Sequence, residues 1–284
     1  MKILVLGATG LIGSEVYRYL SKKNNVYGTY NDKNKIKKIQ YNKKKIFYLD
    51  ALNKKNFIKV IDKVKPDIVI NCIGVTKHIM KVSKNKILTI NGDFPHFAKR
   101  VSNLKLSKFV QVSTDCVFDG YKGNYNESSI PNAQDFYGKS KAAGEINDKI
   151  NLTVRTSTIG REILTKHGLL EWFLSQKSSC YGYSKAIFNG YPTFYFVKIL
   201  EKLIIKNVTG LVNISGNKIN KYTLLNKIKK IYKKKIMIKK NTSIKINRSL
   251  DNRLLNKYLP KLEKNWDKLL KKMKNEYRKN PLKD

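Results

Sequence analysis

The chain has 284 residues, of which 59 are Lys or Arg and 20 are Asp or Glu, so its formal net charge is +39. This length can bury a full hydrophobic core, and no apolar stretch reaches the ~20 residues that a membrane-spanning helix needs. The excess of lysine has two interpretations: a surface for nucleic acid or another polyanion, or a bias that enriches Lys, Asn and Ile along the whole chain. Because the basic runs are mixed with Asn and Ile, we favour the bias and expect no specific nucleic-acid partner.

The chain opens with an apolar run, Lys2 to Leu6, that is followed by glycines and then by apolar residues at helical spacing. This pattern predicts a buried strand, a tight turn and a helix over residues 11–20. Gly7 permits the turn, Gly10 lets the backbone approach a phosphate, and Gly13 lets the helix pack closely on the strand. A turn that only requires positive φ is the alternative, but its place before a helix N-terminus favours binding of a pyrophosphate.

The next predicted strands, 25–30 and 45–50, bear on which dinucleotide the glycine turn would bind. An acid after the second strand of such a fold binds an adenosine 2′-hydroxyl, whereas a cation there accommodates a 2′-phosphate. Asp32 is near the acid position, but Lys33 follows at once, so we favour NADPH with NADH tolerated. Asp50 ends the later strand, where it either contacts the adenine or simply terminates the strand.

Residues 108–114 predict another buried strand, with Thr114 at the carboxyl end, where open α/β sheets bind their ligands. Tyr137 and Lys141 are four residues apart, so on a helix they share one face. An ammonium beside a phenol favours the phenolate, and we therefore expect Lys141 to lower the pKa of Tyr137 from about 10. In a chain rich in Tyr and Lys this pair alone is weak evidence; together with the glycine turn and Thr114 it predicts a redox enzyme.

The chain resembles the extended short-chain dehydrogenases/reductases that act on nucleotide sugars. Within that family, segments 113–120 and 137–145 are similar to dTDP-4-dehydrorhamnose reductases and related nucleotide-sugar reductases. Segments 71–74, 155–157 and 190–193 support the resemblance less specifically.

Alternating strand and helix patterns, together with this resemblance, predict an α/β protein with a Rossmann-type doubly wound parallel sheet and a smaller C-terminal substrate-binding lobe. We expect the NAD(P)-binding domain at 1–160, with 192–206 returning to it, and the lobe mainly at 161–284, interleaved with it. The strand at 210–216 is assigned to the lobe, and a closing helix is expected over 265–277.

The resemblance implies that Tyr137 is the general acid, that Lys141 tunes it and binds the nicotinamide ribose, and that Thr114 orients the substrate carbonyl. The implied reaction is a carbonyl reduction in which hydride comes from the reduced nicotinamide and the proton from Tyr137. Nucleotide-sugar dehydratases of this superfamily carry an Asp-Glu pair after the catalytic threonine. Here Asp115 and Cys116 occupy these positions, so we expect no water elimination.

The resemblance also implies two sets of ligand contacts. Cofactor contacts are expected from Gly7, Thr9, Gly10, Leu11, Ile12, Gly13, Asn31, Asp50, Ala51, Asn71, Cys72, Ile73, Gly74, Tyr137 and Lys141. Substrate contacts are expected from Ser113, Asp115, Val117, Phe118, Arg155 and Arg161. Trp172, Tyr181 and Tyr183 are candidates for stacking on a base or for ordinary packing within the lobe.

The favoured function is reduction of a dTDP- or UDP-linked 4-keto-6-deoxyhexose on the way to a surface polysaccharide. The alternatives are a nucleotide-sugar epimerase and a non-catalytic NADP-binding regulatory subunit; the presence of all three catalytic residues argues against the latter. Three cysteines without paired spacing predict free thiols, and no metal-ligand cluster is evident. With an apolar run that reads as a strand rather than a signal peptide, we expect a cytoplasmic protein. The sequence leaves open whether it forms a homodimer.

Overall fold

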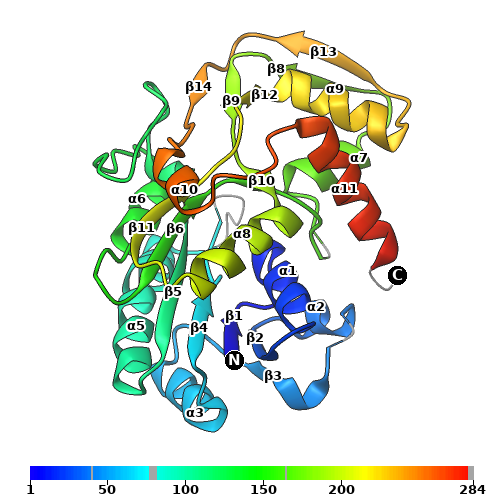
Figure 1. Ribbon diagram of the computed structural model, residues 1–284. Helices are drawn as coiled ribbons and strands as arrows, with labels where there is room; N and C mark the ends of the chain where they lie inside the picture. The colour runs from blue at the N-terminus through cyan, green and yellow to red at the C-terminus, as the bar shows by residue number, and fades with distance from the viewer. Residues whose placement is uncertain (40, 77–81, 164, 281–284) are drawn as a thin grey trace.

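The computed structural model describes residues 1–39, 41–76, 82–163 and 165–280 (Figure 1). Its central strands are β1 (Lys2–Leu6), β2 (Asn25–Tyr30), β3 (Ile46–Tyr48), β4 (Ile68–Asn71), β5 (Lys108–Thr114), β6 (Leu152–Thr156) and β11 (Gly210–Ile214). They form one parallel sheet in the order β11-β6-β5-β4-β1-β2-β3. The predicted Rossmann-type α/β fold is therefore confirmed.

The strand order reverses between β1 and β4, and ligands bind at such a switch point in open α/β sheets. The inner strands β1, β4 and β6 are buried along almost their whole length, as expected when both faces of a parallel sheet are covered. Leu6 at the end of β1 pairs with Asn71 at the end of β4, so the two following loops start at the same level. Beyond its pairing of Gln111 with Asn71, β5 continues to Thr114, which extends it past this edge.

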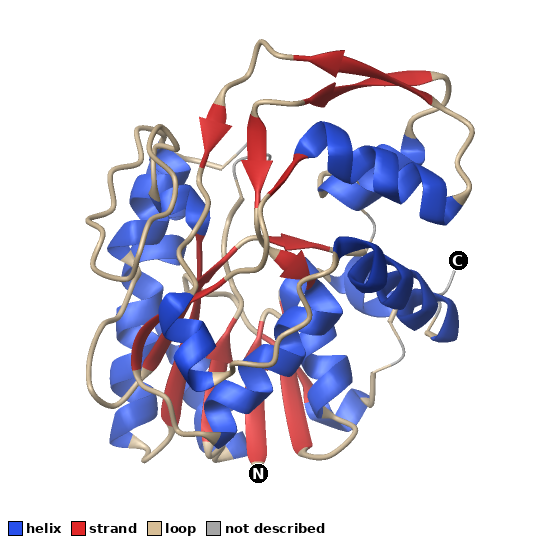
Figure 2. Cartoon of the chain, turned by 45° about the horizontal axis from the view of Figure 1, so that its top comes forward, coloured by secondary structure: helices blue, strands red, loops and turns tan. Residues whose placement is uncertain are grey.

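Helices cover both faces of the sheet (Figures 1 and 2). One face carries α1 (Leu11–Leu20), α8 (Thr193–Ile205) and α10 (Arg253–Tyr258), whose apolar side chains share a core with the strands. The other face carries α3 (Lys54–Val64) and α5 (Phe94–Leu104), with a second core centred on Phe57, Phe94 and Phe109. The shorter helices are α2 (Lys33–Lys37), α4 (Lys84–Leu88), α6 (Phe136–Ala143), the 3-10 turns η1 (Lys43–Lys45) and η3 (Asp115–Val117), and the π-helix η2 (Thr89–Asp93).

A smaller lobe lies beyond the carboxyl edge of the sheet (Figure 2). Its helices are α7 (Leu169–Ser175), α9 (Lys221–Tyr232) and α11 (Trp266–Lys279). Its strands are β8 (Ser179–Tyr183), β9 (Ala186–Phe188), β12 (Ile219–Asn220), β13 (Met237–Asn241) and β14 (Ile246–Asn247), and the short pair β7 (Thr158–Ile159) and β10 (Tyr191–Pro192) joins the two parts. The lobe has its own core, which includes Phe173, Leu224 and Leu270. The predicted closing helix is confirmed as α11.

The assignment of 210–216 to the lobe is wrong. β11 pairs in parallel register with β6, Val212 opposite Val154, and forms the outer strand of the central sheet. The physical reason is that four of the five residues of β11 are buried, as expected for a strand whose two faces are both covered. Among the described residues, no helix has the length and apolarity needed to cross a bilayer.

Candidate active site

The turn between β1 and α1 is shaped by three glycines. Gly7 has φ +76°, and a Cβ built at Gly13 would overlap the Gly7 carbonyl oxygen, so both positions require glycine. Among the described atoms, a Cβ built at Gly10 would contact only the Gly7 carbonyl oxygen, at 3.5 Å, so open space lies in front of it. Gly10 is also the N-cap of α1 and provides no side-chain cap. The first N–H groups of α1 are thus left for an anion, and the turn fits the pyrophosphate of a dinucleotide.

The other residues expected at this end of the cofactor lie at the same edge of the sheet. Thr9 and Ala51 are buried, Leu11, Ile12 and Asp50 are half-buried, and Asn31 is exposed directly after β2. Asp32 is engaged locally, because its carboxylate caps α2 by accepting from the N–H groups of Asn34 and Lys35. Asp50 likewise accepts from the N–H of Leu52, at 3.0 Å.

The segment after β4 lies beside α6, the helix that carries Tyr137 and Lys141. Asn71 is fully buried; its Nδ2 donates to Gln111 Oε1 (2.8 Å) and its Oδ1 accepts from the Ile73 N–H (3.1 Å). A Cβ built at Gly74 would lie 3.7 Å from Lys141 Nζ. The loop from Asn71 to Gly74 is therefore held against Lys141, next to the glycine turn.

Thr114 and Tyr137 meet at the end of β5. Thr114 Oγ1 accepts from the Cys116 N–H (3.1 Å) and lies 3.2 Å from Asp115 Oδ1, to which it donates. Tyr137, in the first turn of α6, shares a hydrogen bond with the Thr114 side chain. Burial raises the pKa of Tyr137 well above its ordinary value, and the nearby Cys116 and Asp115 add to this, while the bond to Thr114 opposes it. Tyr137 is therefore protonated at neutral pH, as a general acid must be.

The expectation that Lys141 lowers the pKa of Tyr137 is wrong for this structure. Lys141 is only 5% exposed, and its Nζ donates to the Val112 carbonyl at 3.0 Å. Burial lowers the pKa of Lys141 to about 8, against the opposing effects of Glu145 and Cys72. At Tyr137, burial changes the pKa more than any neighbouring charge does. Burial also raises the pKa of Cys72 to about 12, so this residue is a neutral thiol at pH 7.

Asn91, which the sequence analysis did not identify, links the segment after β4 to α6. It lies on the π-helix η2, and its side chain accepts from the Val75 N–H (2.8 Å) and donates to the Val75 carbonyl (3.0 Å). The same amide donates to Ser140 Oγ (3.0 Å), which in turn donates to the Tyr137 carbonyl. Single-turn π-helices often occur at functional sites, but an isolated Asn in a helical segment carries no local signal.

Arg248 was also missed, and it connects the lobe to the catalytic segment. Its Nε donates to the Phe118 carbonyl (2.8 Å), and its Nη1 lies 3.7 Å from Cys116 Sγ. Its Nη2 lies 3.5 Å from Asp135 Oδ2, and Asp135 is the N-cap of α6. One side chain from beyond β14 thus touches both the turn after Thr114 and the start of the helix that carries Tyr137. These partners are more than 110 residues distant in sequence.

Two expected substrate contacts, Ser113 and Arg155, are engaged inside the protein. Glu145 accepts from Ser113 Oγ (2.7 Å) and from Arg155 Nε (2.8 Å) and Nη2 (2.6 Å). The side chains of Arg155 and Glu145 are 3% and 8% exposed. The Arg155 guanidinium also stacks on Phe118, 5.0 Å from the ring centroid. This bidentate pair joins β6 to the end of α6 below the catalytic residues.

The remaining expected substrate contacts lie in two places: three follow β5, and one is at the end of α11. Val117 and Phe118 are fully buried in a small core, where Phe118 stacks on Tyr125. Asp115 lies beside Thr114, and burial raises its pKa, with Arg248 the main opposing influence. Arg161 lies apart from this group, at the C-terminus of α11, where it donates to the carbonyls of Tyr277 and Asn280, both at 2.7 Å.

The three aromatic candidates of the lobe are brought together. Trp172, Tyr181 and Tyr183 line one cavity of about 320 Å³, which also includes Lys239. Within the described part of the chain, no cluster of three or more His, Cys, Asp or Glu side chains could hold a metal ion.

Comparison with known proteins assigns the chain to a family. The family described as RmlD substrate binding domain matches residues 1–177, well over half of the sequence. The chain belongs to this RmlD family. The predicted resemblance is confirmed, and the match covers the glycine turn, Thr114, Tyr137 and Lys141.

The chain is similar to proteins named as reductases and to proteins named as subunits of another enzyme. It is 37% identical over 101 residues to a dTDP-4-dehydrorhamnose reductase from Aggregatibacter actinomycetemcomitans, covering 34% of each chain. It is 30% identical over 146 residues to methionine adenosyltransferase 2 subunit beta from Danio rerio, covering 51% of this chain and 42% of that protein. The alignments thus span less than half the length of these relatives.

Similarity in fold to a solved structure covers nearly the whole chain, beyond the region that the sequence alignments match. The dTDP-4-dehydrorhamnose reductase from Bacillus anthracis, in complex with NADP, aligns with a TM-score of 0.81 at 20% identity, covering 97% of this chain and all of the other.

Two glycine variants separate packing from cofactor binding. We expect Gly13→Ala to push α1 away from β1 and to lower the free energy of unfolding by ~1–3 kcal/mol in urea denaturation. Gly10→Ala should change that free energy by less than about 0.5 kcal/mol. In fluorescence titration with NADPH, however, its methyl group should weaken binding by about tenfold or more. Unchanged NADPH affinity in Gly10→Ala would contradict the assignment of the turn.

The buried pair of Arg155 and Glu145 predicts a large loss of stability. Arg155→Met leaves a buried carboxylate without its partner and should cost about 3–5 kcal/mol of unfolding free energy. Arg253→Met is the matched control, since Arg253 is 80% exposed and pairs with Asp251, so it should cost no more than ~1 kcal/mol. Equal losses in the two variants would contradict a structural role for the pair.

The pKa of Lys141 predicts a pH dependence of cofactor binding. Because that pKa is lowered to about 8, the ammonium is present below pH 8 and is lost as the pH rises through this value. We expect NADPH affinity to be constant up to pH 7 and to fall above pH 8 in equilibrium titrations. In Lys141→Arg, whose guanidinium keeps its charge, this fall should disappear. An affinity in the native protein that stays flat to pH 9.5 would argue against contact between Lys141 and the cofactor.

Proposed function

We propose that the protein is an NAD(P)H-dependent reductase of a nucleotide-linked 4-keto-6-deoxy sugar. The observation that carries the proposal is the convergence of Thr114, Tyr137 and Lys141 beside the glycine turn, at the switch point of the sheet. Membership of the RmlD family and the names of several relatives support it.

In this proposal Tyr137 provides the proton. Its raised pKa keeps the hydroxyl protonated, and its bond to Thr114 directs it toward the end of β5. A reduced nicotinamide bound along the glycine turn would supply the hydride. Thr114 holds the substrate carbonyl oxygen, and Lys141, fixed by the Val112 carbonyl, binds the ribose and offsets the negative charge that Tyr137 acquires on giving up its proton.

The residues after Thr114 favour reduction over dehydration. Elimination of water needs an acid and a base besides Tyr137, and Cys116 stands where the dehydratases have a second carboxylate. Asp115 remains, but its carboxyl is buried and hydrogen-bonded to Thr114. We therefore assign no dehydratase activity to this site.

NADPH is the cofactor that we favour. Asp32, the acid nearest to the ribose position, is occupied in capping α2, whereas Lys33 and Lys35 lie immediately beyond it. A lysine there suits the 2′-phosphate of NADPH. The similar structure from Bacillus anthracis is described in complex with NADP.

For the substrate, we propose a dTDP- or UDP-linked 4-keto-6-deoxyhexose whose reduced product enters a surface polysaccharide. Support comes from the relatives named dTDP-4-dehydrorhamnose reductase and from a relative in Haloferax volcanii named a probable low-salt glycan biosynthesis reductase.

A second candidate is a non-catalytic, NADP-binding subunit of another enzyme. It is favoured by the relatives named methionine adenosyltransferase 2 subunit beta, which match about half of this chain. Such a subunit would bind the cofactor but would not turn over a keto sugar. The assembled catalytic residues argue for the reductase.

The reductase predicts oxidation of NADPH that depends on a keto sugar. Purified protein should consume NADPH, followed at 340 nm, with dTDP- or UDP-4-keto-6-deoxyhexoses, and more slowly with NADH. Tyr137→Phe should lower kcat by about a hundredfold or more, because the proton donor is removed while the ring is kept.

The control for this assay is NADPH affinity, which Tyr137→Phe should leave within about threefold of the native value. Activity that is absent across the panel while NADPH still binds would contradict the reductase and favour the subunit. Conversion of the sugar without net loss of NADPH would favour an epimerase.

A further inference from the structure

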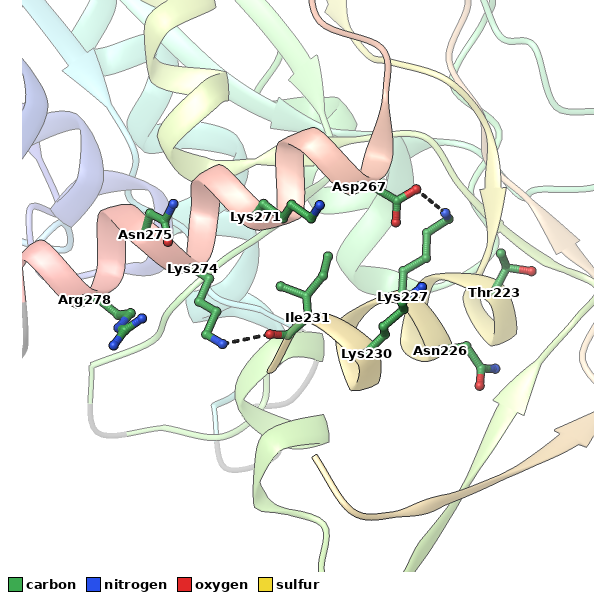
Figure 3. A pocket seen from close by; sticks show the side chains of 10 residues that line it. All are labelled: Thr223, Asn226, Lys227, Lys230, Ile231, Asp267, Lys271, Lys274, Asn275 and Arg278. Carbon is green, nitrogen blue, oxygen red and sulfur yellow. Dashed lines mark hydrogen bonds and ion pairs between the residues drawn. The ribbon is translucent and has the colours of Figure 1, made fainter. Parts of the chain in front are cut away.

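A groove between α9 and α11 carries positive charge on both walls (Figure 3). We call it the α9–α11 groove; its cationic side chains are Lys227 and Lys230 from α9, and Lys271, Lys274 and Arg278 from α11. Its volume is about 790 Å³, within the range of sites for small ligands. None of its lining residues belongs to the candidate active site.

Much of this charge is not neutralised within the protein. Asp267 pairs with Lys227 at 2.6 Å, and Lys274 Nζ donates to the Ile231 carbonyl at the end of α9, at 2.7 Å (Figure 3). In the described part of the chain, no carboxylate lies within ion-pair distance of Lys230, Lys271 or Arg278. All three are exposed.

A second cavity continues the groove past the end of α9. It shares Lys274 and Arg278 with the first and has a volume of about 620 Å³. Its lining adds two cations, Arg161 and Lys233, and one carboxylate, Glu171. Tyr232 lines it as well, and the Tyr232 hydroxyl oxygen is buried without a hydrogen-bond partner in the described structure. A buried hydroxyl without a hydrogen-bond partner is unfavourable, and an acceptor bound in the cavity would satisfy it.

We propose that the α9–α11 groove binds a compact anion with a short chain of phosphates, of the size of tripolyphosphate. Lys271, Lys274 and Arg278 lie along one side of α11 at spacings of three and four residues, so they span ~10 Å of the helix axis. Lys230 faces this row from α9 (Figure 3). A row of three cations on α11 that is faced by a lysine on α9 matches an anion that carries several charges along a short line.

The lining argues for a small polyphosphate rather than for nucleic acid. Proteins that bind single strands combine a basic groove with exposed aromatic rings on which bases stack. Tyr277 is 9% exposed, and its ring lies under the Arg161 guanidinium, 4.4 Å from it. The Tyr232 ring lies under Lys274, with 5.4 Å between Nζ and the ring centroid. The aromatic rings of the second cavity are thus already covered by cations, and the described residues that line the α9–α11 groove include no aromatic side chain.

The test is the binding of inorganic tripolyphosphate to the full chain, measured by isothermal titration calorimetry at 150 mM salt. The groove variant is Lys230→Glu/Lys271→Glu. The matched control is Lys55→Glu/Lys59→Glu on α3, which changes the net charge equally at two exposed lysines. We expect one site in the native protein, the same affinity in the control, and at least tenfold weaker binding in the groove variant.

Three further measurements test whether the effect is specific to the groove. Thermal unfolding and NADPH affinity should be the same in both variants, because all four lysines are exposed and lie outside the candidate active site. Titration with dTDP distinguishes the groove from the substrate site, and dTDP should not compete with tripolyphosphate.

Four outcomes would overturn the proposal. They are absence of binding at 150 mM salt, equal loss of affinity in both double variants, competition by dTDP, and binding of single-stranded RNA that strengthens with length and is lost in the groove variant. The second would assign the effect to overall charge, and the last would make the groove a nucleic-acid surface.

Discussion

The ammonium group of Lys141 is enclosed by protein at the carboxyl edge of the sheet, and the surrounding elements are arranged to hold it there. An ammonium without water is costly unless hydrogen-bonded and compensated, and here the Val112 carbonyl accepts from it while Glu145 favours its charge. Glu145 in turn is held by Arg155 and Ser113. The ends of β5 and β6 and the segment after α6 are therefore fixed relative to one another by three buried charged groups, Lys141, Glu145 and Arg155.

The features predicted correctly from sequence are those set by local pattern. The apolar run that ends at Gly7 predicts β1, and the four-residue spacing of Tyr137 and Lys141 places them on one helix, α6. The features that were missed depend on tertiary contacts. Arg248 reaches Phe118 across 130 residues, and the direction of the Tyr137 pKa depends on how far the site is buried, which no spacing reveals. The strand at 210–214 was misassigned because its pairing with β6 is equally non-local.

The fold determines where the positive charges of this chain, with its net charge of +39, lie relative to one another. A compositional bias explains why lysine is abundant along the whole chain, but not which lysines face each other. Packing of α9 against α11 brings Lys230 and Lys271 to opposite walls of one groove, with a single nearby ion pair between Lys227 and Asp267 among the described residues. General excess charge and a specific anion site are therefore compatible, and they predict different responses to charge reversal at matched positions.

The most direct test of the central claim is the transfer of label from cofactor to sugar. NADPH deuterated at the transferring C4 position should be incubated with a dTDP-linked 4-keto-6-deoxyhexose, and the product analysed by mass spectrometry and NMR. The account predicts one deuterium per product molecule, on the former carbonyl carbon, and formation of the same labelled product about a hundredfold more slowly with Tyr137→Phe, which loses the proton donor but not the hydride donor. A product that carries no deuterium, or a sugar recovered unreduced while the protein retains its bound cofactor, would contradict it.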